Sequence, residues 1–250
     1  MSERDDITRG LRQLLELDRA FGIEFLPRVE TPAVSVRRPA ESPAPGPVAA
    51  AQEALASSEP LLPAAALAAI AREVAACKRC GLCSGRTNTV PGEGDAAARL
   101  VFVGEGPGAD EDAQGRPFAG PAGDLLTKMI AAMGLAREQV FLTNVVKCRP
   151  PDERQPDASE AAACLPFLER QLLAIRPTVI CTLGNTPLRT LMGDPKLGII
   201  SMRGKRLVWK GIPLIPTFHP SYLLRNTPAK KPCWEDLKVV MQLLKEHTDG

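Results

Sequence analysis

Cysteines are the first residues in this sequence whose spacing suggests chemistry. Cys77 and Cys80 form a C-x-x-C pair, and Cys83 extends it by the same step. Cys148 and Cys164 follow in the second half of the chain. Four thiolates can hold a structural zinc ion or a [4Fe–4S] cluster, and spacing alone does not separate the two. No histidine lies near them, which disfavours a mixed zinc site, and the alternative is that Cys164 is a small core residue.

Two polar residues stand at the ends of β-rich runs. Asn144 ends one run, and its amide offers a donor and an acceptor side by side, as the edge of a pyrimidine base requires. His219 ends the last run, where an imidazole can donate a hydrogen bond to a developing negative charge. The alternatives are an asparagine that caps a turn and a histidine with a structural role.

A glycine-rich turn, an acidic stretch and a loop phenylalanine follow the first β-rich run. The turn contains Glu105 and Gly106, and its backbone N–H groups can approach an anion or a base edge. Glu111 lies in the acidic stretch, where a carboxylate can hold a water molecule or stabilise a cation; a solvated turn is the alternative. Phe118 lies between Pro and Gly residues, where it either stacks on a base or anchors the loop.

These residues require a scaffold that brings them together. Short β-rich runs alternate with helical patterns, which predicts a three-layer α/β/α fold around a central four-stranded parallel sheet. The predicted strands are 100–104, 140–146, 179–184 and 212–218, and the predicted helices are 124–133, 158–175 and 234–246. Because ligands bind at the carboxyl ends of such strands, we expect the polar residues to converge there.

The N-terminal quarter has a different character. Residues 1–30 contain an amphipathic helical pattern, and 31–63 are rich in Pro and Ala, which predicts a disordered linker. Residues 64–250 form the predicted folded domain, beginning with a helix over 64–76. We expect the N-terminal helix to bind an unidentified partner protein or the chain itself.

Charge and hydropathy narrow the classes of protein. Residues 1–66 carry a net charge of −3 and the remainder +5, a basic bias compatible with a nucleic-acid partner. We find no secretory signal and no apolar run long enough to cross a bilayer. The sequence therefore predicts a cytoplasmic, monomeric protein without membrane contact, in which seven cysteines indicate metal or redox chemistry rather than disulfides.

In this order, the motifs resemble those of the family 4 uracil-DNA glycosylases, the iron–sulfur branch of their superfamily. The resemblance extends from Cys77 to about Leu244. The matching segments are Cys-Lys-Arg-Cys at 77–80, Gly-Glu-Gly-Pro-Gly at 104–108 with Glu111-Asp112, Gly-Arg-Pro-Phe-Ala-Gly at 115–120, Thr-Asn-Val-Val-Lys-Cys-Arg-Pro-Pro at 143–151, Cys-Leu-Pro-Phe-Leu at 164–168 and His-Pro-Ser-Tyr-Leu-Leu-Arg at 219–225.

The resemblance implies an enzyme that hydrolyses the N-glycosidic bond of deoxyuridine in DNA during base excision repair. It implies a [4Fe–4S] cluster on four cysteines, with Cys83 left as a spare thiol nearby. The implied ligands are Cys77, Cys80, Cys148 and Cys164. The implied uracil pocket consists of Gly106, Phe118, Asn144 and His219.

We hypothesise that Phe118 stacks on the extruded uracil, Asn144 recognises its edge and His219 stabilises the developing oxyanion. Glu111 is the first candidate for positioning water, and Glu105 the second. On a predicted loop after the histidine, an apolar wedge and a basic residue would contact DNA. These residues are Leu223, Leu224 and Arg225. Candidate phosphate contacts are Lys147, Arg149, Arg203, Lys205, Arg206, Lys230 and Lys231.

Two other classes of protein remain possible from the residues. A zinc-containing DNA-binding module explains the cysteines but leaves Phe118, Asn144 and His219 without a role. A nucleotide-binding enzyme on a doubly wound sheet explains the strand pattern. Such an enzyme lacks support because the chain has neither a phosphate-loop Lys-Ser/Thr nor a G-x-G-x-x-G motif.

Overall fold

The computed structural model describes residues 62–247. The predicted N-terminal helix within 1–30 and residues 31–61 of the predicted linker lie outside the described residues, so both stay predictions. No helix between residues 62 and 247 has the length and apolar character needed to cross a membrane.

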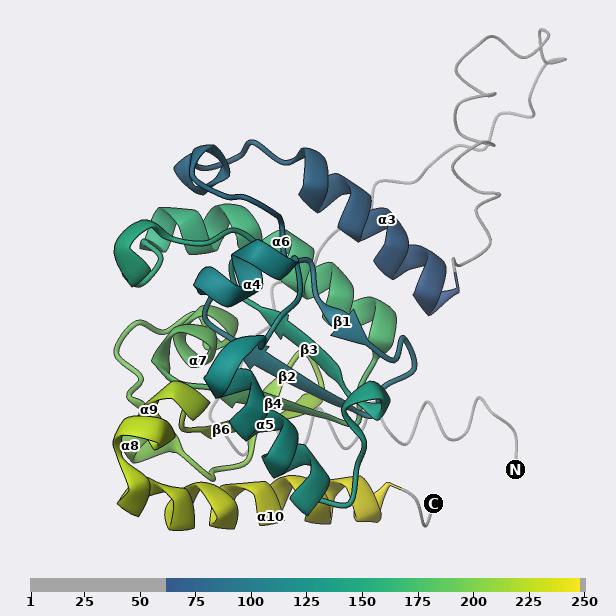
Figure 1. The fold of residues 1–250 in the computed structure, drawn as a ribbon. Coiled ribbons are helices and arrows are strands. Elements are labelled where there is room, and N and C mark those ends of the chain that lie inside the picture. Colours follow the sequence, from purple (N-terminus) through teal and green to yellow (C-terminus); the bar gives the residue numbers. More distant parts are fainter. Residues whose placement is uncertain (1–61, 248–250) are drawn as a thin grey trace, which may run out of the picture. The chain divides into compact units, whose positions relative to one another are not determined.

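A mixed sheet of six strands forms the centre of the described unit (Figure 1). Its strands in spatial order are β1 (Glu93–Gly94), β3 (Phe141–Asn144), β2 (Leu100–Gly104), β4 (Val179–Leu183), β6 (Ile212–Thr217) and β5 (Leu207–Trp209). The four middle strands are parallel, and β1 and β5 pair antiparallel at the two edges. The α/β class and the four parallel strands are confirmed. The prediction missed the edge strands, since segments of two and three residues carry no period-2 pattern.

Helices cover both faces of the sheet (Figure 1). On one face lie α3 (Pro63–Ala76), α6 (Ala158–Ile175) and α7 (Asn185–Met192), and on the other lie α5 (Gly120–Ala132) and α10 (Lys230–Glu246). Side chains along β2 alternate between the two faces of the sheet. Val101 and Val103 pack on the α6 side, while Leu100 and Phe102 pack on the α5 side. Side chains fully excluded from water on both faces explain why these strands are apolar throughout.

The predicted helix 158–175 coincides with α6, while α3, α5 and α10 each begin before the predicted start. A proline lies in the first turn of each of these three helices. The N–H groups of the first helical turn have no acceptor within the helix. Proline, which lacks an N–H, is therefore tolerated there and does not break the helix.

Short elements carry the turns between the main layers. The α-helical ones are α4 (Ala109–Gln114), α8 (Ile199–Met202) and α9 (Pro220–Arg225). The 3-10 turns are η1 (Gly81–Ser84), η2 (Arg137–Gln139), η3 (Pro151–Glu153) and η4 (Thr227–Ala229). Of these, α4 and α9 directly follow β2 and β6, so they border the carboxyl edge of the sheet.

Candidate active site

A cavity of about 440 Å3 lies at the carboxyl ends of β2, β3 and β6. The sequence-predicted residues Gly106, Phe118, Asn144 and His219 all line it. Both candidate carboxylates and two of the candidate DNA contacts line it as well: Glu105, Glu111, Leu224 and Arg225. A second hollow of about 570 Å3 shares Glu105, Gly106, His219 and Arg225 with it, so the two form one concave surface. Strands distant in sequence therefore bring these side chains together.

Gly104, the last residue of β2, allows two of these side chains to approach the strand. A Cβ at this position would lie 2.3 Å from Asn144 Oδ1 and 2.7 Å from Phe118 Cζ. Both distances are too short for any side chain larger than hydrogen. The first strand therefore ends in glycine so that an amide and an aromatic ring can meet over its backbone.

Phe118 is held in an unusual conformation. Its backbone has φ +52°, in the left-handed region that non-glycine residues rarely adopt. The side chain is 5% exposed, and its ring centroid lies 6.1 Å from that of His219 with a 30° tilt. At the start of α5, Gly123 lets the helix pack directly on the Phe118 backbone, since a Cβ there would lie 1.7 Å from the Phe118 carbonyl oxygen. Packing of α5 thus maintains a strained residue at the wall of the cavity.

His219 has a defined tautomer. It caps α9, and its Nδ1 accepts a hydrogen bond from the Ser221 backbone N–H at 3.2 Å, with Ser221 Oγ 2.7 Å away. Because Nδ1 is an acceptor, the neutral ring carries its proton on Nε2. Burial, with a further contribution from the positive charge of Arg225, lowers the pKa of His219 to about 4. Near neutral pH the ring is therefore a neutral hydrogen-bond donor.

The two candidate carboxylates have different partners. Glu111 Oε2 accepts the Gly108 backbone N–H at 3.0 Å, which fixes it at the start of α4. Burial raises the pKa of Glu111 from its usual value. Glu105 instead accepts a hydrogen bond from the Thr186 hydroxyl. Asp112, beside Glu111 in the sequence, binds the backbone N–H groups of Thr87 and Asn88 and has a structural role.

The segment after His219 differs from the predicted loop, since it forms the short helix α9. Its helical spacing separates the two leucines. Leu223 is 2% exposed and packs with Ala229 and Cys233, whereas Leu224 is 46% exposed at the rim of the cavity. Of the two leucines, Leu224 is thus the one that a ligand can contact.

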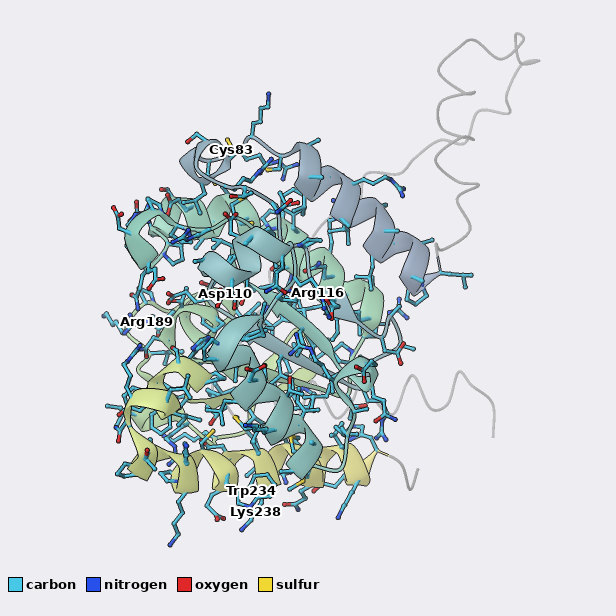
Figure 2. The ribbon with its side chains drawn as sticks, in the orientation of Figure 1. Cys83, Asp110, Arg116, Arg189, Trp234 and Lys238 are labelled. Atoms are coloured by element: carbon cyan, nitrogen blue, oxygen red, sulfur yellow. The ribbon has the colours of Figure 1, made fainter. Side chains whose placement is uncertain are left out.

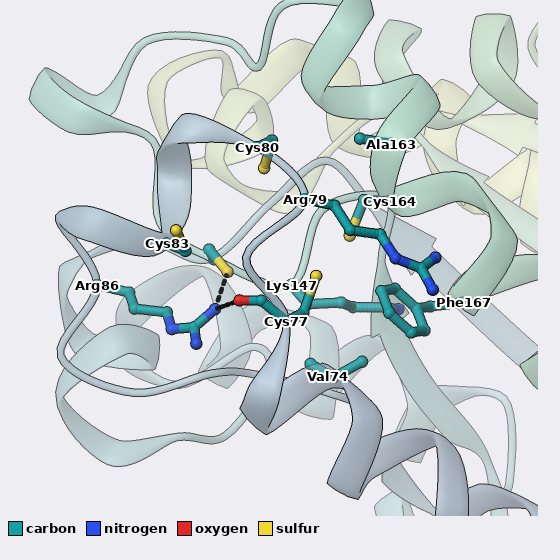
Figure 3. Close-up of a pocket in the computed structure, with 11 residues that line it drawn as sticks. Val74, Cys77, Arg79, Cys80, Cys83, Arg86, Lys147, Ala163, Cys164 and Phe167 are labelled. Atoms are coloured by element: carbon teal, nitrogen blue, oxygen red, sulfur yellow. Dashed lines mark hydrogen bonds between the residues drawn. The ribbon is translucent and has the colours of Figure 1, made fainter.

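A second cavity, on the α3 and α6 side of the sheet, is lined by five cysteines (Figure 3). Cys77 ends α3, Cys80 precedes η1, Cys83 lies within η1, Cys148 follows β3, and Cys164 lies on α6. All seven cysteines have free thiols. Figure 2 shows Cys83 on the side of the molecule opposite Trp234 and Lys238 of α10. Thiols from four separate segments therefore surround one hollow.

The donors around this cavity are thiols with cationic side chains beside them, and such donors fit a thiolate-bound metal group. Among residues 62–247, no three Cys, His, Asp or Glu side chains converge closely enough to hold a single metal ion. Arg86 donates to Cys148 Sγ at 3.2 Å, and Lys147 also lines the cavity. Burial raises the pKa of Cys164 to about 11, although the charge of Lys147 opposes the shift. Positive charge beside these thiols favours the thiolate form, which is the form that binds a metal.

Some predicted phosphate contacts have other partners. Lys147 is 1% exposed, so it does not reach solvent or DNA. Arg203 pairs with Asp236, and Arg206 with Glu246. The prediction for Lys147 was wrong. This residue follows the buried strand β3, and its ammonium donates to Gln171 of α6 in the interior.

The fold and site agree with comparisons to known proteins. The family profile described as the uracil DNA glycosylase superfamily matches residues 91–238. A type-4 uracil-DNA glycosylase from Sulfurisphaera tokodaii is 48% identical over 182 residues, which cover 70% of this chain and 83% of the relative. A type-4 uracil-DNA glycosylase from Thermotoga maritima is 46% identical over 180 residues, covering 71% and 94%.

The chain belongs to the uracil-DNA glycosylase superfamily. Its resemblance to the type-4 glycosylases is also confirmed. The stretch matched by the glycosylase family includes every residue that lines the active-site cavity, together with Cys148 and Cys164.

Sequence reasoning missed two residues of this glycosylase site. Ser221 orients His219, and its signal is a His-Pro-Ser sequence in which Pro220 begins a helix and His219 must cap it. Asp110 lines the cavity from α4 and lies against Gly120 at the start of α5 (Figure 2). The sequence gives no signal for Asp110, because it is one of three consecutive acidic residues and nothing in their order distinguishes it.

Proposed function

We propose that this protein excises uracil from DNA by hydrolysing the N-glycosidic bond of deoxyuridine, which leaves an abasic site for base excision repair. The observation that carries the proposal is the Asn144 carboxamide. It lines the cavity together with Phe118 and His219, and no group within residues 62–247 forms a hydrogen bond with it. The residue is 3% exposed, so the donor and acceptor of its amide open only to the cavity, where a bound ligand can pair with both.

Recognition of uracil follows from the complementarity of this amide. Uracil presents an N–H donor at N3 and a carbonyl acceptor at O4, which match the Asn144 oxygen and nitrogen. Cytosine presents the reverse pattern and would leave two buried polar pairs unsatisfied. Phe118 supplies a face on which the extruded base stacks, worth about 1–3 kcal/mol.

Bond cleavage places negative charge on uracil O2 and positive charge on the sugar. His219 Nε2–H donates a hydrogen bond to O2 as the charge develops, and the backbone near Gly106 assists. Glu111 positions the attacking water and stabilises the sugar cation, with one carboxylate oxygen fixed by the Gly108 N–H. Glu105 is the second candidate for this role.

DNA is held at the rim of the cavity. Leu224 projects from α9 and fills the space that the extruded nucleotide leaves, while Arg225 contacts the phosphate backbone. Leu223 anchors α9 to the core. We expect the enzyme to act as a monomer in the cytoplasm, and the partner of the N-terminal region stays open.

Cys77, Cys80, Cys148 and Cys164 hold a [4Fe–4S] cluster in this proposal. When bound, the cluster crosslinks the end of α3, the segment after β3 and α6, and offers one-electron chemistry. Figure 3 draws Cys77, Cys80, Cys83 and Cys164 around the hollow. In this proposal Cys83 is the thiol left over.

The test is release of free uracil from a uracil-containing oligonucleotide by the purified protein. Asn144→Asp should lower uracil excision about tenfold or more and reduce discrimination against cytosine, because a carboxylate removes the donor. A matched control, Gln155→Glu, changes charge equally at a residue that lines only the adjoining hollow. Absence of uracil release by iron-loaded protein would reject the proposal.

A further inference from the structure

Lys147 is a buried cation that has no carboxylate partner among residues 62–247. It is 1% exposed, and its ammonium donates to Thr143 Oγ1 at 2.6 Å, to the Asn144 backbone oxygen at 2.7 Å and to Gln171 Oε1 at 2.7 Å. All three acceptors are neutral. A buried charge of this kind needs an anionic neighbour.

Lys147 also lies beside the cysteines. It lines the cysteine cavity and directly precedes Cys148 in the chain (Figure 3). The same side chain thus borders the thiols while its Nζ atom donates to the backbone carbonyl of Asn144, the residue that recognises the base.

We propose that Lys147 is a positioning residue that couples the cysteine cavity to the active site. Its ammonium balances thiolate charge on one side, and on the other it fixes the strand end from which the Asn144 carboxamide projects. This inference rests on the proposed function, since it assigns Asn144 to base recognition and the thiolates to a cluster. Loss of the ammonium would remove the side-chain hydrogen bond to the Asn144 carbonyl and loosen this end of β3.

Arg86 provides the matched comparison. Like Lys147 and Arg79 it lines the cysteine cavity, and it donates to Cys148 Sγ and to the carbonyl oxygens of Cys77 and Ala75. None of these partners belongs to the active site. Removing its charge should weaken retention of iron as strongly as removing that of Lys147, with a smaller effect on excision.

The experiment compares Lys147→Met and Arg86→Gln, each with the parent and with Asn144→Ala. Parental excision of uracil is measured first, and its absence would reject the proposed function without involving Lys147. We expect Lys147→Met to lose iron to a chelator faster than the parent. Per iron-loaded molecule, its single-turnover excision rate at saturating DNA should fall about tenfold, with DNA affinity within about twofold.

In the Asn144→Ala background, Lys147→Met should cause little further loss of rate, because it acts through Asn144. Three results would each overturn the inference: equal losses in both backgrounds, an unchanged excision rate, or an Arg86→Gln loss of excision as large as that of Lys147→Met.

If Lys147→Met does not fold, Gln171→Leu serves instead, because it removes one Lys147 acceptor and retains the charge. Its excision rate should fall in the parent but not in Asn144→Ala, and an equal fall in both would overturn the inference.

Discussion

The active-site cavity and the cysteine cavity differ in how their polar groups are paired. Around the active site, the Asn144 carboxamide and His219 Nε2 have no hydrogen-bond partner among residues 62–247. Around the cysteines, Arg86 and Lys147 already supply charge and donors to the thiols. The first arrangement suits a ligand that enters and leaves, and the second suits a group that stays. The segment from Asn144 to Cys148 belongs to both.

The largest expected effect lies in the cysteine cavity. Cys164→Ser should abolish retention of iron and lower the yield of folded protein, because it removes one of four proposed ligands from a buried site. Cys83→Ser is the control, and it should keep the iron content and the absorbance near about 400 nm expected for an iron–sulfur cluster. Equal iron loss in both variants would show that Cys83 is a ligand.

Within the active site, His219→Ala should have the next largest effect. Single-turnover excision should fall about 100- to 1000-fold, because a positioned donor to the developing oxyanion is lost. DNA affinity should change far less, since that bond strengthens only in the transition state. Ser221→Ala removes only the hydroxyl near Nδ1 and should be milder. A loss of affinity equal to the loss of rate would refute the assigned role of His219.

The pKa of His219 yields a smaller and more specific prediction. Because the folded-state pKa is about 4, the ring is neutral throughout pH 5–8, and excision should not decline as pH rises through 6.5. A histidine that acted as a charged acid would lose activity there. Since the unfolded chain binds this proton more tightly, the contribution of His219 to folding stability should increase as pH rises from about 4 to 6.5. A pH–rate profile of single-turnover excision checks the first point, and thermal unfolding checks the second.

The smallest effect distinguishes two adjacent leucines. Leu224→Ala should weaken binding of uracil-containing duplex about two- to fivefold while leaving the folding stability nearly unchanged, because Leu224 is exposed. Leu223→Ala should instead lower the free energy of unfolding by about 2–5 kcal/mol, because Leu223 is buried. Binding titrations and denaturant unfolding of both variants measure the contrast, and a reversed pattern would contradict the assigned orientation of α9.

Much of the fold was predictable because its signals are local. The four apolar runs are the four parallel strands, and the pattern over 158–175 is α6. The short edge strands carry no such pattern, because hydrogen bonds to β3 and β6 define them. Predicted starts of helices were late where proline occupies the first turn.

The site was predictable in its membership and less so in its geometry. Asn144 and His219 stand at strand ends, so the rule for parallel sheets placed them together. The burial of Lys147 and Leu223 depends on α6 and on the packing of α9, which sequence spacing does not reveal. The cysteine pattern similarly indicated a metal site, while the cations that flank it, Arg79, Arg86 and Lys147, are brought there only by the folded chain.

The active site draws on the ends of β2, β3 and β6, from Gly104 to Arg225, so no short stretch of the chain contains it. A chain emerging from the ribosome cannot form the cavity until β6 and α9 have been made and have joined the sheet. A fragment left by proteolysis, or a partly folded chain, would therefore lack one wall of the pocket. For an enzyme that breaks bonds in the genome, this topology ties cutting activity to completed folding.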